Sequence, residues 1–115
     1  MLIDKQSMKW AFALIAALLS ACSPVRNDFA VDVSNAGGAV TAAGVSLCGG
    51  PEQALGRSGK RFAGSVPINC EGSGYVRVSF ADGTTVDCPV GYVTSLETRW
   101  DFVVRGRFCK PKFPA

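Results

Sequence analysis

Cysteine is the residue type with the clearest chemistry in this sequence, which contains five cysteines and no histidine. Four of them, Cys48, Cys70, Cys88 and Cys109, are separated by 22 (48 to 70), 18 (70 to 88) and 21 (88 to 109) residues. Zinc-binding cysteines usually occur in close-spaced pairs, and this sequence has no such pair. An even set of well-separated cysteines in a small exported domain instead predicts two disulfide bonds.

The remaining residues give little support to catalysis. Without histidine, the chain cannot form a Ser-His-Asp or Cys-His nucleophile arrangement, or a histidine-ligated metal site. Residues 56–60 (GRSGK) resemble the end of a phosphate-binding loop, but Ala54 stands where the first glycine is due and Arg61 where serine or threonine would bind magnesium. The carboxylates show no spacing typical of a general acid–base pair. The sequence therefore predicts a protein that is not an enzyme and that uses no metal or cofactor.

The fifth cysteine, Cys22, follows an apolar segment near the start of the chain. Residues 10–19 (WAFALIAALL) are all apolar, and Lys5 and Lys9 precede them. Ten helical residues span about 15 Å, roughly half of a bilayer core, so the segment is too short to cross a membrane. A charged flank followed by a short apolar core is typical of a secretory signal peptide, here starting at Met1 or Met8.

The residues around Cys22 resemble a known processing site. Leu19-Ser20-Ala21-Cys22 is similar to the lipobox of bacterial lipoproteins, in which a leucine stands three positions before the cysteine with small residues between. The resemblance covers residues 1–23 and implies cleavage before Cys22, diacylation of its thiol and acylation of the new amino terminus. Ser23, in place of the aspartate that favours inner-membrane retention, implies an outer-membrane protein in a two-membrane host. Two or three acyl chains would tether the protein permanently.

These features divide the chain into three parts. We expect a signal peptide over residues 1–21, a lipidated tether over 22–28, and one β domain with a basic C-terminal tail over 29–115. A length of 115 residues leaves room for one domain. After Lys5, Lys9 and Asp4 are removed, the twelve basic and nine acidic residues become ten and eight, a net charge of +2. This charge is too small to argue for nucleic acid as a partner.

The mature chain has the pattern of a β protein. Runs of alternating or branched apolar residues occupy 29–33, 39–48, 61–68, 75–80, 84–90 and 99–108, with turn signals between them. The glycine-rich connection 49–59 contains one expected helical turn at 51–55 (PEQAL), where proline suits the first helical position. The pattern predicts an all-β fold: a small antiparallel β-sandwich, Ig-like or barrel-like, of about six strands with two disulfides. In the last strand Trp100, Phe102 and Val104 should face the core.

One hairpin can be assigned a register. A three-residue loop at 81–83, with Gly83 in the left-handed conformation, pairs Val76 with Cys88 and places Arg77 opposite Asp87. Both faces of the hairpin are then self-consistent, because Cys88 joins the apolar face and the two charges share the other. A two-residue loop would instead mix apolar and charged residues on one face.

Strand direction then predicts how the cysteines pair. If each strand runs opposite to the one before it, Cys48 and Cys109 fall at the end where strand 29–33 starts, and Cys70 and Cys88 fall at the other end. Bonded cysteines need Cα atoms within about 7 Å of each other. This reasoning favours Cys48–Cys109 and Cys70–Cys88 over the two other connectivities.

Two groups of surface residues are candidate contact sites. The basic residues Arg105, Arg107, Lys110 and Lys112 cluster around Cys109, where the strand count puts them beside the tether. There they would contact anionic headgroups or lipid phosphates, unless they form only a solvated tail. Glu71, Tyr92 and Thr94 belong to the opposite, membrane-distal end. There Tyr92 would contact a partner, unless it packs over the Cys70–Cys88 bridge.

The sequence as a whole predicts a lipid-anchored, non-enzymatic binding or structural component of the outer membrane or periplasm. Its partners would be the membrane, through the acyl chains on Cys22, and an anionic lipid, a glycan or an envelope protein. The alternative is an inhibitor or accessory subunit that docks on an envelope enzyme or transporter through its membrane-distal loops.

Overall fold

The structure, a computed structural model, describes residues 25–94, 96 and 98–112 of the chain. The proposed signal peptide, the lipobox and Cys22 lie outside these residues. In the described part of the chain no helix is long and apolar enough to span a membrane. The strands are β1 (Arg26–Ala36), β2 (Val40–Leu47), β3 (Gln53–Ala54), β4 (Gly56–Ser58), β5 (Arg61–Pro67), β6 (Gly72–Phe80), β7 (Thr85–Val93), β8 (Arg99–Gly106) and β9 (Phe108–Pro111).

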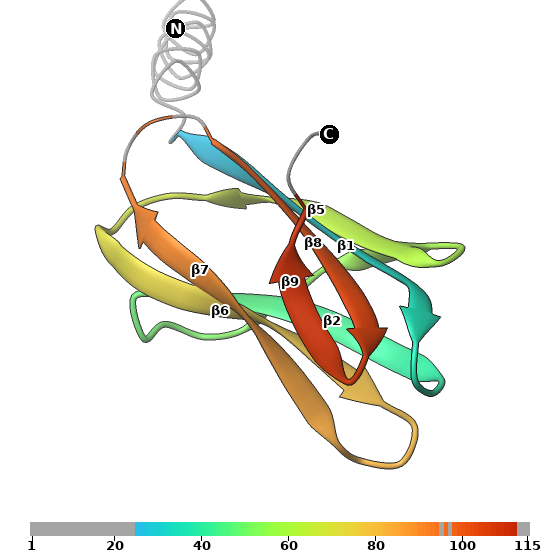
Figure 1. Cartoon of the computed structure of the whole chain (residues 1–115). Helices are drawn as coiled ribbons and strands as arrows, with labels where there is room; N and C mark the ends of the chain where they lie inside the picture. The colour runs from blue at the N-terminus through green and yellow to red at the C-terminus, as the bar shows by residue number, and fades with distance from the viewer. Residues whose placement is uncertain (1–24, 95, 97, 113–115) are drawn as a thin grey trace, which may run out of the picture.

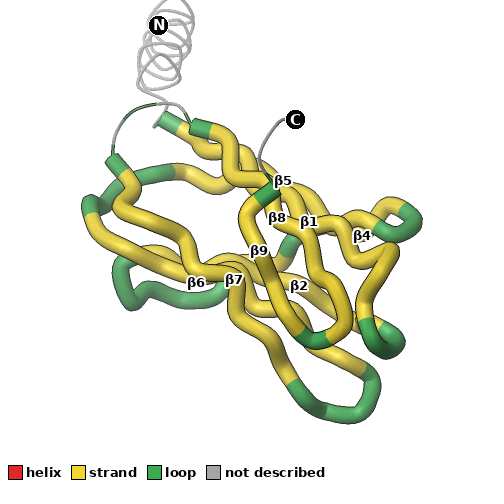
Figure 2. Tube along the Cα trace, in the orientation of Figure 1, coloured by secondary structure: helices red, strands yellow, loops and turns green. Residues whose placement is uncertain are grey.

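The strands form two sheets that pack face to face as a sandwich (Figures 1 and 2). One sheet has the order β4-β5-β1-β8-β9 and the other β3-β2-β6-β7. The predicted all-β sandwich with two disulfides is confirmed. Among the described residues it has nine strands rather than about six. β1 pairs with β8 in parallel, whereas the other strand pairs of this part of the chain are antiparallel.

The core follows from the alternation of apolar residues along the strands. Phe29, Val31 and Val33 point inward from β1, and Phe102 and Val104 do so from β8. Each fully buried valine or phenylalanine side chain contributes roughly 1.5–3 kcal/mol relative to its exposed state. The inward direction predicted for Phe102 and Val104 is confirmed, while Trp100 on the same strand face is only partly buried.

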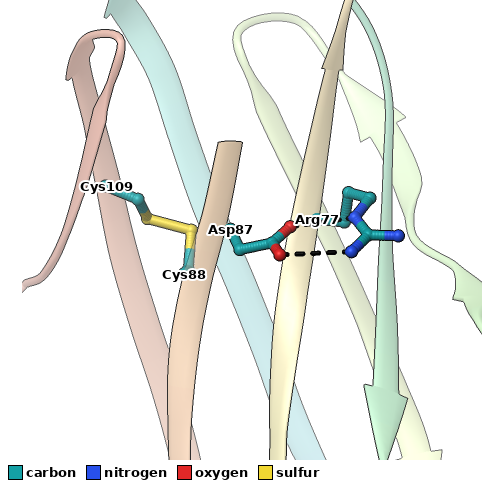
Figure 3. The surroundings of a disulfide bond; sticks show 4 residues. All are labelled: Arg77, Asp87, Cys88 and Cys109. Carbon is teal, nitrogen blue, oxygen red and sulfur yellow. Dashed lines mark hydrogen bonds and ion pairs between the residues drawn. A yellow bond between two sulfur atoms is a disulfide. The ribbon is translucent and has the colours of Figure 1, made fainter. Parts of the chain in front are cut away.

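The β6–β7 hairpin has the register predicted from the sequence. Val76 pairs with Cys88 and Arg77 with Asp87, and Gly83 has a φ of 87°. The Arg77 guanidinium donates two hydrogen bonds to the Asp87 carboxylate, at 2.9 and 3.2 Å (Figure 3). Cys88 is fully buried, as its place on the apolar face required.

The predicted disulfide connectivity is wrong. The bonds join Cys48 to Cys70 and Cys88 to Cys109, with Cα atoms 6.5 and 5.2 Å apart. The Cys88–Cys109 bond connects β7 and β9, which are edge strands of different sheets (Figure 3). It therefore closes one side of the sandwich.

The error comes from two chain reversals that the strand count missed. Residues 51–55 form no helical turn, because β3 and β4 lie in this connection and pair with β2 and β5. They carry the chain back along the sandwich, so β5 runs in the same direction as β2, and Cys48 and Cys70 follow at the same end. The predicted strand 99–108 is in fact β8 and β9 with a turn at Gly106, whose φ is 59°. This turn brings Cys109 back beside β7.

Candidate functional site

The two ends of the sandwich carry the surface residues singled out from the sequence. We call the end where the chain enters β1 the entry end, and the end with the β1–β2, β6–β7 and β8–β9 connections the turn end (Figure 1). β1 starts at the entry end opposite the end of β5, with Arg26 paired with Pro67. Gly72 and Val93 meet at the same end in the other sheet.

The predicted partner-contact group and the two arginines of the basic group were assigned to the wrong end, whereas Lys110 and Lys112 lie back along β8, opposite Val103 and beside Asp101. Glu71 precedes β6 and Thr94 follows β7, so these residues and Tyr92 lie at the entry end, where β1 starts, and not at the opposite end predicted for them. Arg105 and Arg107 lie at the turn end, opposite the start of β1, because β8 runs parallel to β1. The same missed reversals that made the disulfide prediction wrong account for these errors.

The entry end is held together by a buried polar residue. Asn27 is 1 % exposed, and its Oδ1 accepts a hydrogen bond from the backbone N–H of Thr98 at 3.0 Å. The Asp28 N–H donates to the Thr98 carbonyl at 3.1 Å, and the Ile68 N–H donates to the Val25 carbonyl at 2.7 Å. Sequence reasoning missed Asn27, because the polar residues around it indicated a tether. Its role depends on a partner 71 residues away.

Two apolar side chains project from the entry end. Tyr92 is 64 % and Leu96 70 % exposed. Tyr92 is exposed because of a bulge between the pairs Gly72–Val93 and Gly74–Val90, which turns Val93 rather than Tyr92 into the core. The alternative in which Tyr92 packs over a disulfide and caps the core is therefore wrong.

A mostly apolar groove of about 440 Å³ lies between β7 and the β8–β9 pair, on the side of the sandwich that the Cys88–Cys109 bond bridges. Its lining includes Pro89, Gly91, Trp100 and Pro111. The Trp100 ring stacks on Phe29, with ring centroids 6.4 Å apart. Its Nε1 is buried and has no hydrogen-bond partner among the described residues. The groove can therefore take an apolar group that brings a hydrogen-bond acceptor.

A second, polar hollow of about 590 Å³ lies on the outer face of the sheet containing β1. Asp32 accepts hydrogen bonds from the Ser34 N–H and hydroxyl at 2.8 and 2.6 Å, and these bonds lower the pKa of its carboxyl group. Asp101 accepts from Arg99 at 2.9 Å. Both carboxylates of this hollow are thus already bonded, while Lys60 and Lys112 on its rim leave it positively charged.

The predicted basic cluster is divided in the structure. The Arg107 guanidinium lies over the Phe80 ring, 3.9 Å from its centroid, and pairs with Asp82 at 2.9 Å. This pairing, together with the Thr84 hydroxyl and N–H, holds the pKa of Asp82 well below its usual range. Arg107 is therefore a structural link between two turns, while Arg105, Lys110 and Lys112 are exposed along β8 and β9. Next to Arg107, Phe108 is 74 % exposed.

Among the described residues, no cluster of histidine, cysteine or acidic side chains would hold a metal ion. No family model matches the chain, and neither a curated protein nor a solved structure is significantly similar to it.

Proposed function

We propose that this chain is a lipid-anchored, non-enzymatic binding or structural component of the outer membrane or periplasm. The observation that supports this most directly is the short distance between the lipobox cysteine and the folded domain. Val25, whose carbonyl is bonded to Ile68, follows Cys22 by only three residues. Three extended residues reach about 11 Å. An acylated Cys22 would therefore hold the entry end close to the bilayer surface.

The same geometry would orient the whole domain. The 11 residues of β1 span roughly 36 Å from the entry end to the turn end. The turn end would then face away from the membrane that carries the anchor. Two disulfides and a buried apolar core suit a small domain that must persist outside the cytoplasm.

Bonded acidic side chains support a role without catalysis. Asp82, Asp87 and Asp101 each pair with an arginine, and Asp32 is bonded to Ser34. A general acid or base needs an atom free to exchange a proton with a substrate. These four carboxylates are instead bonded to groups of the domain itself.

Acylation can be tested directly in cells. The unchanged chain, expressed in a bacterium with two membranes and fed labelled palmitate, should take up label and fractionate with the outer membrane. Cys22→Ser should take up no label and appear in the soluble periplasmic fraction with both disulfides intact. The proposal fails if the unchanged chain is not labelled, or if both forms fractionate identically.

A second candidate is an inhibitor or accessory subunit that docks on an envelope enzyme or transporter. The observation that favours it is Phe108, a largely exposed aromatic residue at the turn end beside the fixed Arg107. Aromatic and arginine side chains are enriched at interaction hot spots. A photo-crosslinking residue at position 108 should then give one discrete protein adduct in living cells. The absence of a protein adduct at position 108, with adducts only to lipid or glycan at other positions, would favour the first candidate.

A further inference from the structure

We propose that the entry end is an interfacial membrane contact, in which Tyr92 and Leu96 insert among the phospholipid headgroups of the leaflet that carries the anchor. This inference rests on the proposed acylation of Cys22. It adds a second membrane contact, made by the folded domain itself, and therefore a fixed orientation of the sandwich on the bilayer.

The exposed apolar side chains are the first observation. Tyr92, Leu96 and Phe108 are the large hydrophobic residues that the described chain leaves exposed, and two of the three lie at the entry end. Tyrosine is favoured at membrane interfaces because its ring is apolar and its hydroxyl reaches water or headgroups. Leucine adds apolar surface, and its side chain has no polar group that would be dehydrated on insertion.

Attachment to the start of β1 is the second observation. Thr98, two residues after Leu96, bonds to Asn27 and Asp28 of β1. Tyr92 lies within β7. Both side chains thus belong to the end of the sandwich at which Val25 precedes β1. A tether of about 11 Å brings this end within reach of the headgroup region, into which interfacial segments insert by about 5–10 Å.

Charge distribution indicates that the contact is apolar rather than electrostatic. Among the described residues of this end, the acidic Glu71 is exposed just before β6. Arg99 is paired with Asp101, and Arg26 donates to the Ser65 hydroxyl and carbonyl. The exposed Arg105 lies at the opposite end. The contact should therefore depend little on ionic strength, unlike a contact made by a basic patch.

Tryptophan fluorescence provides a depth measurement. The lipidated full chain, its Leu96→Trp form and its Phe108→Trp form would each be incorporated into phosphatidylethanolamine–phosphatidylglycerol vesicles with brominated acyl chains. The unchanged protein gives the baseline from Trp100. Phe108 is a matched control, because it is as exposed as Leu96 but lies at the turn end. We expect the emission added by Trp at 96 to fall about twofold on bromination, as for a residue in the headgroup region.

The emission added by Trp at 108 should not change, and the result should be the same in low and high salt. Equal quenching of the two variants, or none at position 96, overturns the inference. Tyr92→Trp is a second probe of the same surface and should behave like Leu96→Trp.

Flotation of the same samples separates this inference from the anchor. If the lipidated protein floats with vesicles but Trp at 96 is not quenched, the anchor stands and the membrane contact of the domain is disproved. If the protein does not float, the proposed anchor fails and the contact fails with it. Flotation together with selective quenching at 96 supports both.

Discussion

Arg107 in the β8–β9 turn and Asp82 in the β6–β7 turn form an ion pair of 2.9 Å that joins the turns of two different sheets. The guanidinium also covers the Phe80 ring and donates to the Thr84 hydroxyl. Arg107 therefore links the two sheets at the turn end. The pair is exposed, so its electrostatic contribution should be modest and sensitive to salt.

We expect Asp82→Asn to lower the melting temperature by a few degrees at neutral pH. The folded-state pKa of Asp82 is depressed, chiefly by the hydrogen bond from Arg107. Its carboxylate therefore stabilises the fold fully above the unfolded value of about 3.8, and this stabilisation is lost as the pH falls through the folded-state value. Thermal melts of both forms from pH 7 downward should converge in strong acid. A difference that persists there, or that high salt does not reduce at pH 7, would contradict the ionic origin.

Loss of either disulfide should lower the free energy of unfolding by about 3 kcal/mol in the chain-entropy model, because the closed segments are nearly equal at 22 and 21 residues. The two losses should differ in their local effect. Cys88→Ala/Cys109→Ala removes the covalent link between β7 and β9, so the groove should open and Trp100 emission should shift to the red. Cys48→Ala/Cys70→Ala is the matched control and should leave Trp100 emission in place. Urea denaturation and emission spectra measure both effects, and equal red shifts would contradict the assignment.

Asn27→Ala should lower the free energy of unfolding by about 0.5–1.5 kcal/mol, because the Thr98 N–H loses the hydrogen bond that the buried Asn27 Oδ1 accepts. The variant should also be destabilised locally, at the entry end. Amide exchange in residues 96–99 should accelerate more than exchange in β6, which shares no hydrogen bond with Asn27. Asn27→Asp keeps an acceptor oxygen in place and tests whether the acceptor, rather than the side-chain volume, is required. Uniform acceleration over the whole domain would argue against the local role.

Two glycines should respond differently to alanine. At Gly74 a Cβ atom would overlap the Ser46 carbonyl oxygen and lie 2.9 Å from Leu47 Cδ2. Gly74→Ala should therefore lower the free energy of unfolding by about 1–3 kcal/mol. At Gly91 the nearest atom to a Cβ would be in the Trp100 ring at 3.5 Å, an ordinary contact. Gly91→Ala should be tolerated, and similar losses in denaturant titrations of the two variants would contradict the described packing.

Local patterns in the sequence were sufficient to predict the sandwich and one complete hairpin. Arg77 and Asp87 could be placed opposite each other because the apolar residues beside them allow only one register. β3 and β4 could not be predicted, since two or three residues are too few for an alternating pattern. Gly106 reverses the chain within an apparently continuous strand. Because these two reversals were missed, the later strands were given the wrong direction. The predicted disulfide pairing and the predicted positions of the candidate surfaces were wrong for the same reason.

The position of β1 in its sheet has a consequence for how the chain folds. β1 is the first strand in the sequence, yet it lies between β5 and β8, and its pairing with β8 joins residues 28–36 to residues 99–106. Such distant contacts require a large loop to close before they stabilise anything, which slows folding. During synthesis or export, the edge of β1 that pairs with β8 stays unpaired until almost the entire chain has emerged. Truncation before β8 would leave that edge permanently open and prone to aggregation.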